Sequence, residues 1–251
     1  MLSYLRPGNE FPQLYQIHHL FAFSSVGRLL VPFLRELGLN CSEPQSDRVQ
    51  GIVSTLIFFE NVYLELFWLE EKSYPAQFEM ATEFNFTARA NWLETGASPF
   101  GFSLCHLTDN ANLSTSTDEI IKIDRAPLSE QLPRFPPEKL TRLEEPICKV
   151  ISDDVATRDR LNRVLVIPEH IMTQTLDMRQ LTHVKLRVRS DKPFGHGFAY
   201  RTLTSPLLNL ATQNILDIEY RKSPLLELTF DDGNQKRYLD LRPLIPIILR
   251  Y

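Results

Sequence analysis

Two parts of the chain share one order of predicted elements, strand, helix, strand and strand, and such a repeat constrains a fold more than any single propensity does. The first copy has apolar residues at strand or helix spacing in residues 16–23, 24–37, 52–60 and 62–69. The second copy has them in residues 181–188, 206–212, 216–221 and 225–230. In each copy a short link joins the last two strands, which predicts a hairpin. The repeat therefore predicts two similar units within one α+β chain.

Local signals refine the first unit. Ser24 and Ser25 are good N-cap residues for its helix, and Gly38 is a natural stop. Pro32 lacks a backbone donor, so we expect it to kink this helix or to move its start.

The segment between the two units is less regular. It contains a turn of helix at residues 88–94, a strand at residues 100–107, a polar stretch and a proline-rich stretch. Because nothing in it indicates a separate core, we predict an insertion within a single domain. The predicted parts of this domain are a first module at about 14–71, an insertion with connecting strands at about 72–179, and a second module at about 180–251.

Composition excludes several classes of partner. The chain has 27 Lys and Arg against 31 Asp and Glu, a formal charge of -4, and no basic run, so we expect no nucleic-acid partner. No apolar window approaches the roughly 20 residues of a membrane span, and the N-terminus lacks a signal-peptide pattern, so we expect no membrane partner and a cytoplasmic protein. Cys41, Cys105 and Cys148 have no metal-ligand spacing and are read as reduced thiols.

One histidine and one glutamate recur at matching places in the two units. With the strands aligned, His19 matches His183 and Glu65 matches Glu227. Each glutamate lies on the less apolar face of its strand, and the two leucines that flank it in sequence lie on the opposite face. Two units side by side would bring all four side chains into one cleft. Imidazole and carboxylate groups together are a suitable ligand set for Zn, Fe, Mn, Ni or Co.

Each residue of the first pair also has an explanation that needs no metal. His19 on a Phe-rich strand is often a packed, hydrogen-bonded core histidine. Glu65 must be paired, protonated or metal-bound if it is buried, and Arg89 is a candidate partner.

The second pair has a similar alternative. Lys185 and Arg187 share the strand face of His183, which is typical of a solvated face. These cations would then neutralise Glu227 in place of a metal or bind an anionic substrate.

The repeated units resemble the vicinal oxygen chelate superfamily, and within it the glyoxalase-like branch. The resemblance rests on I-H-H-L at residues 17–20, Y-L-E-L at 63–66, L-L-E-L at 225–228 and W-L-x-T-G-x-S-P-F-G at 92–101. It implies two tandem βαβββ modules that form a cupped mixed β-sheet, with helices on the outer face and an irregular insertion between the modules. It also implies a homodimer.

Two functions follow from the resemblance. The first is a metal-dependent isomerase, lyase or dioxygenase acting on a small oxygen-rich substrate, with a divalent metal on His19, Glu65, His183 and Glu227 and with Glu65 or Glu227 as general base. The second is a metal-free protein that binds or sequesters a small aromatic or anionic molecule in the same cleft. The predicted lining residues are Phe21, Phe23, Tyr63, Phe67, Lys185 and Arg187.

The position of the second module has an alternative. Residues 100–107 also look like the usual opening of a second module in this branch. On that alignment the equivalent of His183 falls at Phe102 or Ser103, and neither is a good metal ligand. A third hypothesis assigns protein association to the insertion at residues 109–179.

Overall fold

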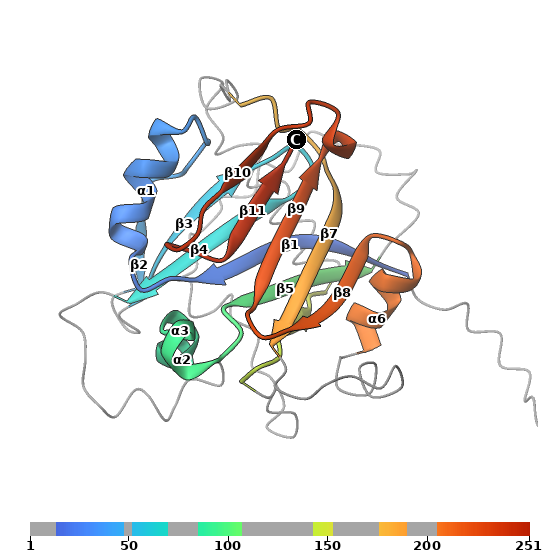
Figure 1. The fold of residues 1–251 in the computed structure, drawn as a ribbon, viewed down its shortest axis with the longest axis horizontal. Helices are drawn as coiled ribbons and strands as arrows, with labels where there is room; N and C mark the ends of the chain where they lie inside the picture. Colours follow the sequence, from blue (N-terminus) through green and yellow to red (C-terminus); the bar gives the residue numbers. More distant parts are fainter. Residues whose placement is uncertain (1–13, 48–51, 70–84, 107–142, 153–175, 190–204) are drawn as a thin grey trace, which may run out of the picture.

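The computed structural model describes residues 14–47, 52–69, 85–106, 143–152, 176–189 and 205–251, and their strands form two mixed sheets (Figure 1). Sheet A has six strands in the order β2-β3-β4-β1-β5-β6, and sheet B has five in the order β10-β11-β9-β7-β8. The strands of sheet A are β1 (Tyr15–Phe23), β2 (Gln45–Asp47), β3 (Ile52–Phe58), β4 (Tyr63–Leu69), β5 (Phe100–His106) and β6 (Ile147–Val150). Those of sheet B are β7 (Leu181–Arg189), β8 (Leu216–Arg221), β9 (Leu225–Phe230), β10 (Tyr238–Asp240) and β11 (Ile247–Arg250).

Few helices accompany these sheets in the described residues. They are α1 (Gly27–Glu36), α2 (Phe86–Ala90), α3 (Trp92–Thr95), α6 (Ser205–Thr212) and the 3-10 helix Asp231–Gly233. The predicted α+β class is confirmed, but the strands lie in two sheets rather than in one.

The first unit has the predicted order of elements. Helix α1 follows β1, and the next three strands place β4 beside β1 in parallel, β3 antiparallel to β4, and β2 at the edge. The predicted hairpin is present, with Phe58 opposite Tyr63. Pro32 lies inside α1, which begins at Gly27 rather than at Ser24 or Ser25.

The second unit has the predicted elements but a different pairing. Strands β8 and β9 have the expected bounds, yet β8 pairs in parallel with one edge of β7 while β9 pairs antiparallel with the other. The predicted second hairpin is therefore wrong. The link at residues 222–224 is long enough to step over one strand, because four extended steps reach about 13 Å and two strand spacings need about 10 Å. Strand β9 is buried along nearly its whole length and takes the central place, whereas β8 is mostly part-exposed and suits the edge.

The insertion contributes to sheet A. Strand β5 pairs antiparallel with β1, and β6 pairs in parallel with β5. The helical turn predicted at residues 88–94 corresponds to α2 and α3. Residues 107–142 and 153–175, and with them most of the predicted insertion, lie outside the described residues.

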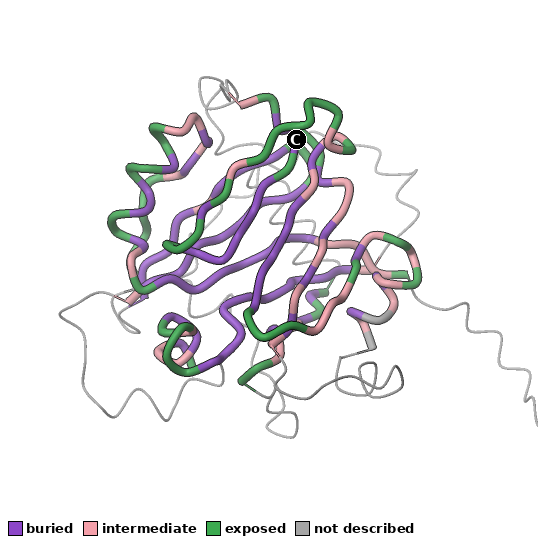
Figure 2. Tube along the Cα trace, in the orientation of Figure 1, coloured by how far each residue is buried: buried purple, intermediate pink, exposed green. Residues whose placement is uncertain are grey.

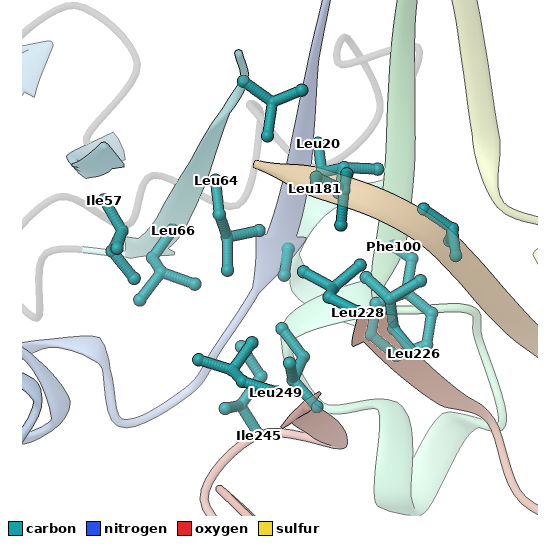
Figure 3. Packing of buried hydrophobic residues seen from close by; sticks show 14 of the residues in the cluster. Leu20, Ile57, Leu64, Leu66, Phe100, Leu181, Leu226, Leu228, Ile245 and Leu249 are labelled. Carbon is teal, nitrogen blue, oxygen red and sulfur yellow. The ribbon is translucent and has the colours of Figure 1, made fainter. Parts of the chain in front are cut away.

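The two sheets pack face to face on one hydrophobic cluster. Leucines of β1, β4, β7, β9 and β11 meet there, together with Phe100 of β5 (Figure 3). Strands β1, β3, β4 and β5 of sheet A and strands β9 and β11 of sheet B are buried for most of their length (Figure 2). Leu30 of α1 and Leu210 of α6 belong to the same cluster, so these two helices pack on the core and not on an outer sheet face.

Polar contacts also join the sheets. The side chain of Asn61, in the β3–β4 turn, accepts from Leu181 N and donates to Leu181 O, both at 2.9 Å. Asn209 Oδ1 of α6 accepts from Tyr15 N at 3.2 Å, and Nε2 of Gln213, the residue after α6, donates to Tyr15 O at 3.2 Å. These bonds fix how β7 and α6 sit against sheet A.

Candidate functional site

The four predicted metal ligands fall into two pairs on opposite faces of the molecule. His19 and Glu65 alternate with leucines of the intersheet cluster, so they lie on the face of sheet A that is turned away from sheet B, called here the outer face of sheet A. His183 and Glu227 alternate with core residues of β7 and β9 and lie on the corresponding outer face of sheet B. The hydrophobic core separates the pairs, so the structure does not bring the four side chains together. In the described part of the chain, no group of three or more His, Cys, Asp or Glu is placed to hold a metal ion.

On sheet B, Glu227 is held by two arginines. Its oxygens lie 2.9 Å from Arg187 Nη2 and 2.7 Å from Arg250 Nη2, while its own side chain is only 7% exposed. Arg187, which shares the strand face of His183, thus forms an ion pair with Glu227.

Other side chains of this face also lie close to carboxylates. Lys185 Nζ lies 2.7 Å from Glu219 Oε1, and His183 Nε2 lies 3.5 Å from Asp217 Oδ2. The hydrogen bond from Lys185 is the main reason that the pKa of Glu219 is lowered. Because the side chains of Lys185 and Glu219 are 31% and 29% exposed, this part of the face behaves as a solvated one.

The outer face of sheet A carries a row of polar side chains that crosses four strands. His19 of β1 pairs with Ser103 of β5, and Ser103 pairs with Lys149 of β6. On the other side of β1, the ring of Tyr63 from β4 stacks on that of His19, with 4.5 Å between centroids and 14° between planes. We call Tyr63, His19, Ser103 and Lys149 the polar row. All four are buried, with exposed fractions between 0% for Ser103 and 9% for Lys149.

A second histidine adjoins the row. The pairing of β1 with β5 shifts between Ile17 and His19, so His18 occupies an irregularity in the strand. Its Nδ1 lies 2.9 Å from Nδ1 of His19, within hydrogen-bond distance. Such a bond needs a proton on one nitrogen and a lone pair on the other, so at least one of the two rings is neutral.

Phe21, two residues after His19 on β1, lies next to the polar row on the same face of sheet A. It pairs with Glu65 on one side and Gly101 on the other, and its ring lies in the space that a side chain at position 101 would fill. Lys149 Nζ lies 5.5 Å from the centroid of this ring, within the range of a cation–π interaction. Phe67 lies beyond Phe21, with ring centroids 6.0 Å apart. Four of the predicted lining residues, Phe21, Phe23, Tyr63 and Phe67, therefore lie on the same face as His19 and Glu65, whereas Lys185 and Arg187 lie on the outer face of sheet B.

Ser103 has the most unusual environment in the row. Its side chain is fully buried, and its Oγ has no hydrogen-bond partner within the described structure. A buried polar atom without a partner costs about 1–3 kcal/mol, and such atoms are rare in folded proteins. The sheet thus holds a hydroxyl in place between an imidazole and an ammonium group.

Arg89 of α2, considered as a partner for Glu65, holds two loops together. Its Nη1 donates to Ser98 O at 2.6 Å and to Glu145 O at 2.9 Å. Burial lowers the pKa of this guanidinium to about 10. These bonds tie the start of β6 to the start of β5 and so help to place Lys149 beside Ser103.

Sequence reasoning missed half of the polar row. Residues 144–152, which contain Lys149, have a sequence typical of a strand, but β6 is only four residues long, too short for an alternation that would single out the lysine. Ser103 appeared only as the poor ligand of the alternative alignment. The alternation Gly101, Ser103 and Cys105 between bulky residues of β5 was the available sign of a distinct second face.

No described helix is long and apolar enough to cross a membrane. In the comparisons with known proteins, no family model and no curated protein matches this chain.

Proposed function

We propose that this chain binds a small molecule at the polar row of sheet A and does so without a metal. The observation that carries the proposal is the buried hydroxyl of Ser103, which has no partner in the described structure. A polar ligand atom at this place supplies the missing hydrogen bond and removes the cost of burying the hydroxyl alone.

The surroundings of Ser103 suit an organic ligand. Ligand sites typically combine a largely apolar wall with a few fixed polar groups. Here Phe21 and Tyr63 supply apolar surface, and His19 and Lys149 supply polar atoms on the two strands that flank β5. The β-sheet backbone fixes the spacing of these groups, which favours a preformed site over one assembled on binding.

The polar row does not fit the metal that the vicinal oxygen chelate resemblance implies. That resemblance calls for His and Glu from both modules, and His19 and Glu65 provide one such pair. The second half of the row provides a hydroxyl from Ser103 and an ammonium from Lys149. An ammonium has no lone pair for a metal and repels a cation, so we route no step of the function through one.

The strand arrangement of sheet A supports a glyoxalase-like architecture as part of this proposal. Strand β6 lies parallel to β5 as β4 lies parallel to β1, and the two inner strands are antiparallel. This relation favours the alignment that opens the second module at Phe100, in which Ser103 faces His19. Sheet B is then an addition that covers the apolar side of sheet A.

A fragment screen on the full-length protein tests the proposal. Binding is followed in amide correlation spectra for the wild type, Ser103→Ala and Lys149→Met, with Lys185→Met on the outer face of sheet B as the matched control. Far-UV circular dichroism and a urea transition show that each variant is folded.

We expect at least one fragment to bind the wild type and Lys185→Met alike and to lose affinity in both variants of the row. If every fragment that binds keeps its wild-type affinity in Ser103→Ala and in Lys149→Met, the site is refuted. Metal content is measured on the same preparations. A stoichiometric divalent metal that is lost in His19→Ala would overturn the metal-free reading.

A further inference from the structure

We propose that two copies of this chain pair edge to edge through β10 and so join their B sheets across a twofold axis. Strand β10 stands at the end of the strand order of sheet B (Figure 1). Figure 2 shows that most of this stretch is exposed, and Tyr238 has an exposed fraction of 65%. An exposed strand edge is a template for pairing with another chain. The proposal does not rest on the polar row of sheet A.

The backbone of β10 turns every second residue away from sheet B. Arg237 exchanges two hydrogen bonds with Tyr251, at 2.9 and 3.0 Å, so its N–H and C=O groups face the β11 side. Because the direction alternates along an antiparallel strand, the N–H and C=O groups of Tyr238 and Asp240 point outward. Within the described structure these outward groups have no hydrogen-bond partner, so this edge of sheet B is open.

The limits of the strand select one register. A pairing centred on Leu239 sets Tyr238 of each copy opposite Asp240 of the other, and each such pair exchanges both of its backbone hydrogen bonds. A pairing centred on Tyr238 needs an extended Lys236, but this residue has a φ of 56°. A pairing centred on Asp240 sets two carboxylates opposite each other and needs Arg242 N, which already donates to Asp240 Oδ1 at 3.1 Å. The register centred on Leu239 therefore uses both outward residues of each copy.

The side chains suit this register on both faces of the sheet. On the inner face, Leu239 is half-buried against the intersheet cluster, and the same leucine of the second copy would cover more of it. On the outer face, Tyr238 meets Asp240 of the second copy. Arg242 donates to both oxygens of Asp240 within each copy and compensates its charge. The planar guanidinium also offers the tyrosine ring a surface for stacking.

The first test is the mass of the full chain in solution. Strands this short bury little surface, so we expect a weak dimer with a dissociation constant on the order of 100 μM. In sedimentation equilibrium, the weight-average mass should rise from that of one chain toward that of two between about 10 μM and about 1 mM. Tyr238→Pro removes an outward N–H that β11 does not use, so it should keep the far-UV circular dichroism and weaken the dimer at least about 10-fold. A wild type that stays monomeric over this range would overturn the proposal, as would a dimer that Tyr238→Pro leaves unchanged.

Cysteine cross-linking tests the register and does not depend on the proline variant. In the proposed dimer, Leu239 faces itself in a non-hydrogen-bonded pair with Cα atoms about 4.5 Å apart, within reach of a disulfide. Leu239→Cys should therefore form a covalent dimer in a glutathione redox buffer. Tyr238→Cys is the matched control, because the offset along the strand puts its two Cα atoms more than about 7 Å apart. Equal cross-linking of the two variants, or none in either, overturns the proposed pairing. The wild type gives the background from Cys41, Cys105 and Cys148.

Discussion

Gly101 gives a sharp test of how the outer face of sheet A is packed. An alanine Cβ at this position would overlap Cε2 and Cζ of Phe21 and would lie 2.8 Å from Cδ2. Neither partner has room to move. Gly101 is in a paired strand, and the 5% exposed ring of Phe21 is enclosed by Phe23 and Phe67. Gly101→Ala should therefore destabilise the folded state through this overlap, and the lower backbone entropy of the unfolded chain should not offset the loss.

The magnitude follows from known costs of overpacking. Inserting one methyl into a packed core costs typically 1–3 kcal/mol, and we expect about 2–3 kcal/mol here because the ring is held on several sides. Phe21→Ala alone should cost about 3–5 kcal/mol through lost burial and a cavity. In the double variant the alanine methyl fills part of the vacated space. The double variant should then be about 1–2 kcal/mol more stable than the sum of the single effects predicts.

Urea unfolding of the four proteins, followed by far-UV circular dichroism, measures this coupling energy. Ser103→Ala on the same strand is the control, because it removes atoms without creating an overlap. Additive effects of Gly101→Ala and Phe21→Ala would show that the ring does not occupy the space above Gly101. The described geometry of this face, and with it the wall assigned to the ligand, would then be refuted.

Three further changes have defined outcomes. Glu227→Gln should lower the free energy of unfolding by about 1–2 kcal/mol in urea titrations, less than Arg187→Met combined with Arg250→Met, because only the latter leaves a buried charge unpaired. Burial raises the pKa of the Cys41 thiol from 9.0 to about 11, so the unfolded thiol ionises first; wild-type stability should fall between pH 9 and 11 relative to Cys41→Ala, measured by thermal melting. Arg89→Met should cost roughly 2–4 kcal/mol in the same melts, since it leaves two carbonyls without their donor.

Element bounds in this chain were predictable where side-chain alternation is strong. The first β-hairpin and the bounds of β8 and β9 follow from such alternation and from short links. Strands β2, β10 and β11 are three or four residues long, too short for a period to show. The pairing of β8 was missed because the link at residues 222–224 serves a hairpin and a strand-crossing connection equally well.

The site was predicted less well than the elements, and the reason is geometric. The alternation of side chains along each strand shows that His19 and Glu65 share a face, and that His183 and Glu227 share a face. It does not show what covers each face. In one cupped sheet the less apolar faces of both units line the same cleft. In two sheets packed on their apolar faces, those same faces point away from each other.

The same packing also decides where a binding site is able to form. Polar side chains on the outer faces of sheets A and B cannot meet across a core of leucine and phenylalanine, so among the described strands a group of polar residues on either outer face is assembled within one sheet. On the outer face of sheet B, charged side chains neutralise one another in ion pairs at the surface, such as that of Lys185 with Glu219. Sheet A instead buries His19, Ser103 and Lys149 and leaves the Ser103 hydroxyl without a partner in the described structure, at a cost in stability. An alanine at this position would avoid that cost, and the buried hydroxyl is the observation on which the proposed binding site rests.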